Sequence, residues 1–233
     1  MSNKAWIIFA VVAVGLLAAL VAVSGRGKVD VNNIDTHSIL KLSEASGNIS
    51  DQVYGNVDSK VVLIEYGDFQ CPTCGTVHPI IKSLTEKYKG QMAFVFRNFP
   101  LTSSHPNARA AAAAVEAAGL QGKYWEMHNK IFETQTSWSG LSANDRGGFF
   151  TNAAQELGLN VDTFNADMAS ASVTKKISFD QALGKKDKVN ATPTVFLNGQ
   201  AVELQVLTDS TKFDDLLKAE MKKQNIELPA EAK

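Results

Sequence analysis

Two short apolar runs with a helical pattern between them stand out along the chain. Residues 60–66, KVVLIEY, are rich in β-branched side chains and predict a buried strand. Residues 78–90, HPIIKSLTEKYKG, place apolar side chains at helical spacing. Residues 91–100, QMAFVFRNFP, predict a second strand that ends at Pro100. The order strand, helix, strand predicts a β-α-β unit.

Helical patterns dominate the stretch that follows. Residues 105–119, HPNARAAAAAVEAAG, contain a run of alanines that favours a helix, with Gly119 expected at its C-terminal cap. Further helices are expected within KYWEMHNKIFE, within SANDRGGFFTNAAQELG, where Ser142 is the expected N-cap, and within DTFNADM. A helix over 172–188 then precedes residues 189–204, VNATPTVFLNGQAVEL, where Thr-Pro-Thr opens a strand and Asn-Gly predicts a hairpin turn.

The longest apolar run lies at the N-terminus. Residues 5–23 carry no charge and as a helix would extend about 28 Å, close to a hydrocarbon core of about 30 Å. This predicts a membrane anchor. The alternative is a cleaved secretory signal, although the apolar part of such signals usually spans about 7 to 15 residues. Lys4 before the run and Arg26 and Lys28 after it leave the orientation open. Residues 25–50 are polar without sustained periodicity and predict a tether.

Composition adds little to this pattern. A chain of 233 residues, 45% hydrophobic and 20% charged, fits one globular unit of medium size. The net charge of −1 gives no indication of a nucleic-acid partner.

The candidate chemistry lies at the junction between the first strand and its helix, in the sequence EYGDFQCPTCGTVHP. Cys71 and Cys74 are the only cysteines of the chain, too few for a disulfide framework or for a four-ligand zinc site. A helix N-terminus stabilises a thiolate, so Cys71 is the predicted nucleophile. Pro72 suits the first helical turn. Cys74, one turn later and separated from the proline by Thr73, is the predicted resolving thiol.

Three neighbouring polar residues have competing interpretations. Glu65 is a carboxylate in an apolar strand, which is either buried for a purpose, such as proton transfer to Cys74, or an exposed strand-end acid. His78 either modulates the cysteine pair from the same helix face or is a surface residue, and Cys-X2-Cys-X3-His permits a metal site. Asp68 is expected to be a turn residue, and His105 receives no role.

The chain resembles the DsbA-like branch of the thioredoxin-fold disulfide oxidoreductases, especially its membrane-anchored bacterial members. The similarity runs from about residue 51 to about residue 217, and its specific parts are EYGDFQCPTC and ATPTVFLNG. The resemblance implies that Pro193 is cis beside the cysteine pair and that the backbone of Thr192 binds an extended substrate segment. It also supports a buried acid at Glu65. Pro72-Thr73 differs from the Pro-His of the strongest oxidants in the family.

The expected fold class is α/β, a thioredoxin fold with an inserted all-helical domain, preceded by a transmembrane helix. The expected segments are an anchor (1–24), a linker (25–50), the first thioredoxin part (51–102), the helical insert (103–170), the second thioredoxin part (171–225) and a tail (226–233).

The resemblance implies a thiol oxidase that introduces disulfides into cysteine-containing exported polypeptides. Its expected location is a bacterial cell membrane, single-pass, with the catalytic domain on the extracytoplasmic side. No cofactor is expected apart from the redox-active Cys71–Cys74 disulfide, and no metal is expected. A DsbB- or VKOR-like quinone-linked membrane oxidase is the expected reoxidation partner. The alternatives are a disulfide reductase or isomerase, a metallochaperone for Cu or Zn using His78, and a non-catalytic peptide-binding module.

Overall fold

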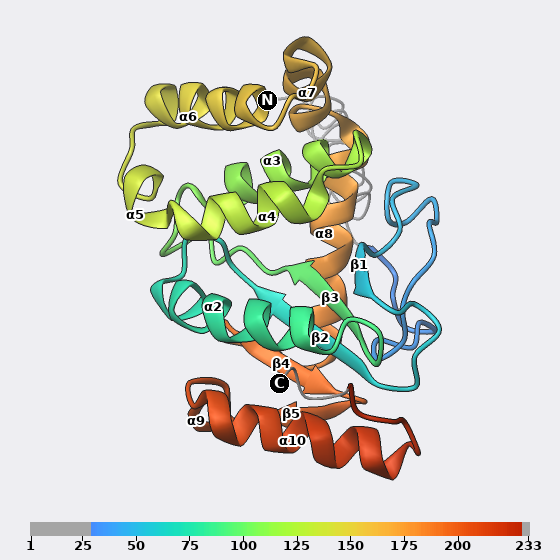
Figure 1. Ribbon diagram of the computed structural model, residues 1–233. Helices are drawn as coiled ribbons and strands as arrows, with labels where there is room; N and C mark the ends of the chain where they lie inside the picture. The colour runs from blue at the N-terminus through green and yellow to red at the C-terminus, as the bar shows by residue number, and fades with distance from the viewer. Residues whose placement is uncertain (1–28, 230–233) are drawn as a thin grey trace, which may run out of the picture. The chain divides into compact units, whose positions relative to one another are not determined.

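Five strands form one mixed sheet in the order β1-β3-β2-β4-β5 (Figure 1). β2 lies at the centre, parallel to β3 and antiparallel to β4, and its residues are almost all buried because helices cover both faces of the sheet. The strands are β1 (Val53–Gly55), β2 (Val62–Gly67), β3 (Ala93–Asn98), β4 (Thr194–Leu197) and β5 (Gln200–Val202). The two strands predicted from the first apolar runs are therefore neighbours.

Helices lie on both faces of this sheet. In the computed structural model, which describes residues 29–229, α2 lies in front of the sheet in the view of Figure 1 and α8 passes behind it. α9 and α10 follow the last strand and run along the lower side of the same view. The bounds are α2 (Pro72–Lys87), α8 (Ala171–Lys186), α9 (Leu204–Leu207) and α10 (Ser210–Lys223).

Five further helices stand between β3 and α8 in the chain and form a layer beside the sheet (Figure 1). They are α3 (Ala108–Leu120), α4 (Tyr124–Glu133), α5 (Gln135–Trp138), α6 (Ala143–Glu156) and α7 (Val161–Met168). Most alanines of α3 are fully buried, and their small side chains let α4, α7 and α8 approach closely. Ser142 caps α6 as expected, by accepting a hydrogen bond from the Asp145 N–H. α3 does not end at Gly119 but continues to Leu120, and the left-handed glycine that follows is Gly122, with φ of +76°.

The N-terminal part of the described chain differs from the tether predicted over residues 25–50. A compact unit begins at Val31, whose side chain is buried, as is that of Ile49. Buried Arg97 on β3 binds this segment by donating to the carbonyl oxygens of Thr36 and Ser38. The polar composition of the segment is therefore compatible with a fixed path, because its backbone supplies the acceptors.

The predicted anchor over residues 1–24 lies outside the described residues. Within residues 29–229, none of the helices combines the length and the apolar character needed to cross a membrane.

Candidate active site

Cys71 lies where β2 gives way to α2. It is the N-cap residue of α2, with φ of −68° and ψ of 122°, and Pro72 is the first residue of the helix. The Cys71 side chain is 6% exposed, whereas Cys74, one turn later, is fully buried. Both are free thiols in the structure. Both residues are therefore buried, and only Cys71 keeps a small exposed fraction.

The Cys71 sulfur is surrounded by hydrogen-bond donors that favour its thiolate. The pKa of Cys71 is lowered to about 5, chiefly by the hydrogen bond with the Cys74 thiol, against the opposing effect of burial. The Thr192 hydroxyl and the backbone N–H groups of Cys74 and Thr73 add to the lowering. These backbone groups belong to the first turn of α2, so the helix N-terminus adds to the stabilisation, although less than the Cys74 thiol and the Thr192 side chain do.

Thr192 contacts Cys71 from the far end of the sequence. The bond between Thr192 and Pro193 is cis, and it leads directly into β4 beside β2. As a neutral thiol, Cys71 donates to the Thr192 carbonyl oxygen at 3.3 Å. In that form the buried Thr192 hydroxyl has no partner among the described residues. Ionisation of Cys71 gives this hydroxyl an acceptor, because the thiolate can then accept from it.

Glu65 lies on β2, close enough to both thiols to interact with them electrostatically. Its side chain is almost completely buried. Burial, and to a smaller degree the charge of Cys71, raises the pKa of Glu65 to about 8. Burial also raises the pKa of Cys74 well above its usual value, with further contributions from Cys71 and Glu65. Near neutral pH the arrangement therefore combines a Cys71 thiolate with a protonated Cys74 and a largely protonated Glu65.

His78 lies on α2 but takes no part in this network. Its ring stacks on Phe132 of α4, with centroids 4.8 Å apart and an interplanar angle of 22°. Burial lowers the pKa of His78 to about 4, so the ring is neutral near pH 7. Within residues 29–229, no three metal-binding side chains lie close enough together to hold an ion, and Cys71, Cys74 and His78 do not form such a group.

Two residues near the cysteines have roles that sequence reasoning missed. Asp68 is a buried anchor for the catalytic loop and not only a turn residue: it accepts from the backbone N–H groups of Gln70 and Leu101 at 2.8 Å. It also pairs with His105 at 2.7 Å. Gln135, the first residue of α5, donates to two carbonyl oxygens of the same loop. The position of Asp68 within the cysteine motif was a usable signal, whereas nothing in the sequence around Gln135 indicates its target.

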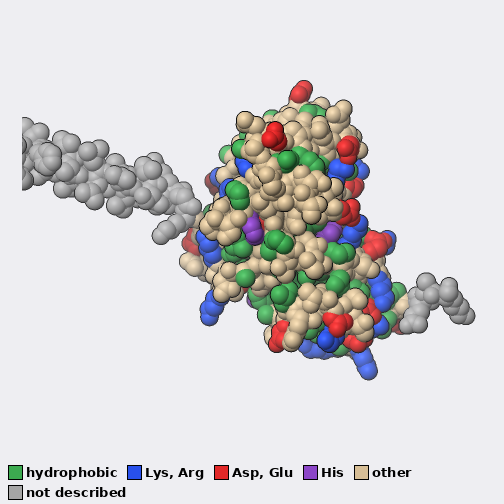
Figure 2. All heavy atoms as spheres, turned by 90° about the vertical axis from the view of Figure 1, so that its left-hand side faces the viewer, with side chains coloured by type: hydrophobic (Ala, Val, Ile, Leu, Met, Phe, Trp, Pro, Cys, Tyr) green, Lys and Arg blue, Asp and Glu red, His purple; other side chains and the backbone are tan. Residues whose placement is uncertain are grey.

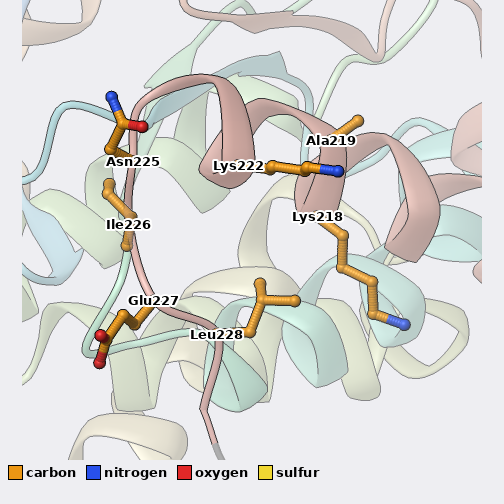
Figure 3. Close-up of a pocket in the computed structure, with 7 residues that line it drawn as sticks. All are labelled: Lys218, Ala219, Lys222, Asn225, Ile226, Glu227 and Leu228. Atoms are coloured by element: carbon orange, nitrogen blue, oxygen red, sulfur yellow. The ribbon is translucent and has the colours of Figure 1, made fainter.

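The surface around the start of α2 is mixed. Figure 2 shows this face of the molecule, on which hydrophobic side chains are scattered among uncharged polar side chains and backbone, and charged side chains lie mainly toward the edges. The surface hollow of about 510 Å³ in Figure 3 lies elsewhere, between the end of α10 and the chain that follows it. Its lining includes Lys218, Lys222 and Ile226 but neither cysteine, so it does not belong to the candidate active site.

Comparison with known proteins agrees with this geometry. A family described as Thioredoxin matches residues 47–219. The solved structure of BdbD from Bacillus subtilis is similar with a TM-score of 0.65 and 21% identity, over 79% of this chain and 98% of that one. That of α-DsbA1 from Wolbachia pipientis has a TM-score of 0.62 and 22% identity, over 74% and 92%. At these identities the likeness shows the fold, and the expected thioredoxin-like α/β fold of the DsbA type is confirmed.

Among curated proteins, the chain is similar to Na⁺/H⁺ antiporter NhaA 1 of Mycolicibacterium vanbaalenii. The two are 36% identical over 153 residues, which is 64% of this chain and 23% of the antiporter. The chain therefore matches less than a quarter of the length of this relative.

Proposed function

Because the chain belongs to the thioredoxin family, we propose that it is a thiol–disulfide oxidoreductase that works through Cys71 and Cys74. The observation that carries the proposal is the contrast between the two thiols. The thiol of Cys71, which keeps 6% exposure, has a pKa of about 5, and the fully buried thiol of Cys74 has a pKa raised well above its usual value. One is suited to be nucleophile and leaving group, the other to be the resolving thiol.

The exchange follows from these properties. In the oxidised protein a substrate thiolate attacks the Cys71 sulfur, the Cys71–Cys74 bond breaks, and Cys74 leaves as a thiolate. Cys74 then takes a proton, for which the protonated carboxyl of Glu65, buried and electrostatically coupled to Cys74, is a source. A second substrate thiolate attacks the substrate sulfur of the mixed disulfide, and Cys71 leaves as its stabilised thiolate. The substrate gains a disulfide, and the protein gains two electrons.

The direction of the reaction follows from the stability of the leaving thiolate. The more the Cys71 thiolate is stabilised, the more stable the reduced protein becomes and the more oxidising the couple. We therefore propose oxidation of cysteine-containing exported polypeptides as the activity, with disulfide reduction or isomerisation as the alternative.

Substrate binding and location complete the proposal. The backbone of Thr192, beside cis-Pro193 and within 3.3 Å of the Cys71 sulfur, is suited to pair with an extended substrate segment. The apolar run of residues 5–23 supports a membrane anchor. We further propose that the catalytic domain lies on the extracytoplasmic side, where disulfides persist, and that a DsbB- or VKOR-like quinone-linked oxidase, the partner that the DsbA-like resemblance implies, reoxidises it.

The reduction potential of the Cys71–Cys74 couple tests this proposal. It is measured by equilibrating the protein with glutathione buffers, with Cys71→Ser as the control that removes the reaction. A potential near −120 mV, typical of strong oxidants, would support disulfide donation, and one near −270 mV, typical of thioredoxin, would favour the reductase. A couple that does not titrate, or that is recovered with bound Cu or Zn, would contradict both.

A further inference from the structure

Gln135 joins the helical insert to the catalytic cysteine. Its side-chain Nε2 donates to the carbonyl oxygen of Phe69 at 2.7 Å and to that of Cys71 at 2.9 Å. Both carbonyl groups belong to the loop that delivers Cys71 to the start of α2. We propose that Gln135 is a positioning residue, which holds this loop so that the first turn of α2 stays aimed at the Cys71 sulfur. The inference rests on the proposed thiol–disulfide exchange.

The insert holds Gln135 firmly enough for this role. Trp138 closes the same short helix, is fully buried, and donates from Nε1 to the carbonyl oxygen of Ile131 at 2.8 Å. The next residue, Ser139, accepts at its carbonyl oxygen from Gln70 Nε2 at 2.7 Å. Two side chains therefore link the loop before α2 to the insert. Gln70 of the loop donates to the carbonyl oxygen of Ser139, and Gln135 of α5 donates to two carbonyl oxygens of the loop.

Gly75 makes room for the Gln135 side chain. A Cβ atom at this position would lie 2.6 Å from Oε1 and 3.2 Å from Nε2 of Gln135. Such contacts are too short, so any residue larger than glycine would displace the end of the Gln135 side chain. A glycine inside a helix is unfavourable compared with alanine, and the passage it leaves for Gln135 gives a physical reason for glycine one residue after Cys74.

Loss of the Gln135 hydrogen bonds should change the pKa of Cys71 in one direction. The Cys71 carbonyl accepts from the Gly75 N–H at 3.1 Å as well as from Gln135, so Gln135 fixes the same peptide group that begins the helix. Loss of Gln135 would free two carbonyl groups and loosen the loop, and the N–H groups of Thr73 and Cys74 would then be less well aligned with the thiolate. The pKa of Cys71 should therefore rise and the couple should become less oxidising.

The test is a double-mutant cycle in the full chain. It comprises Gln135→Ala, Gly75→Ala and the double variant, with the Cys71 pKa followed by thiolate absorbance and the redox equilibrium measured against glutathione. We expect each single variant to raise the pKa and to lower the equilibrium constant for glutathione oxidation, by up to about tenfold, which corresponds to about 30 mV. The double variant should show no further change, because Gly75→Ala acts by displacing Gln135.

Two further variants keep the outcome decisive. Gln121→Ala is the matched control, because Gln121 also sits in the insert and bonds a backbone carbonyl, that of Asn160, but does not contact α2. Gln135→Glu keeps the size of the side chain and places oxygen against two carbonyl oxygens, so it should raise the Cys71 pKa at least as far as the alanine variant.

Two results would overturn the inference: a Gln135→Ala shift no larger than that of Gln121→Ala, or additive effects of Gln135→Ala and Gly75→Ala. Failure of the proposed function is distinguishable, because the wild-type protein would then not exchange disulfides, whereas the thiolate titration would still report on Gln135.

Discussion

Glu65→Gln should make the protein more stable at neutral pH while impairing its chemistry. The carboxyl group has a pKa of about 8 in the folded protein against an ordinary value of 4.5, mainly because it is buried. The folded state therefore holds a proton that the unfolded state releases above pH 4.5, and stability falls as the pH rises from 4.5 to 8. Glutamine has nearly the same shape and does not ionise, so it removes this dependence.

The magnitude follows from the pKa difference. One pKa unit corresponds to about 1.4 kcal/mol. The free energy of unfolding that is lost because of the raised pKa of Glu65 therefore grows from almost nothing near pH 4 to about 3 kcal/mol at pH 7 and about 5 kcal/mol above pH 8. The glutamine amide has its own burial cost, but that cost is the same at every pH. The informative quantity is therefore how the difference between variant and wild type changes with pH.

Urea unfolding of the reduced protein at several pH values between 4 and 8 measures this quantity. The stability of Glu65→Gln relative to wild type should increase by about 3 kcal/mol between pH 4 and pH 7. The same comparison in a Cys71→Ala background should keep most of the increase, since burial is the larger cause. A difference that stays flat across this range would refute the reasoning, because Glu65 would then ionise in the folded protein as it does in water. Disulfide exchange should be slower in Glu65→Gln, since Cys74 loses its proton partner.

Three further predictions concern single side chains. A thiolate titration of the reduced protein should have its midpoint near pH 5, and alkylation at pH 7 should label Cys71 before Cys74; the reverse order would contradict the assigned roles. Arg97→Met should cost about 3–5 kcal/mol in urea unfolding, because buried Asp51 loses one of its two ion-pair partners, keeping only Lys176, and the carbonyl oxygens of Thr36 and Ser38 lose their donor; a loss below about 1 kcal/mol would contradict this. His78→Phe should leave the pH dependence of exchange above pH 5 unchanged, because the ring is already neutral there, and a lost inflection near pH 6 would show that it titrates.

Much of the catalytic arrangement could be predicted because its signals are local. The apolar strand before Cys71, the proline after it and the helical spacing beyond are all read within one short stretch of sequence. The structure places Cys71 at the N-cap of α2 and Cys74 one turn on, in agreement with that pattern. The alanine run likewise predicted a helix, although not its last residue, because helix ends depend on single hydrogen bonds.

Other features depend on contacts between distant segments and have no local signal. Whether Glu65 is buried or exposed was an open choice in the sequence, and it is decided by the central place of β2 in a sheet whose two faces are covered by helices. His78 was either a modulator of the cysteine pair or a surface residue, and its packing on Phe132 of the insert shows that it is buried. Among the described residues it forms no metal-binding group with Cys71 and Cys74.

The sequence by itself predicted the roles that we propose for the two thiols, because a helix start and a one-turn spacing are properties of neighbouring residues. Only the tertiary structure decided what surrounds them. The carbonyl of Thr192 reaches Cys71 across 121 positions, and the amide of Gln135 reaches the Cys71 carbonyl across 64. Hydrogen bonds of this kind depend on where folded elements place single atoms, and no periodicity or composition in the chain encodes that placement.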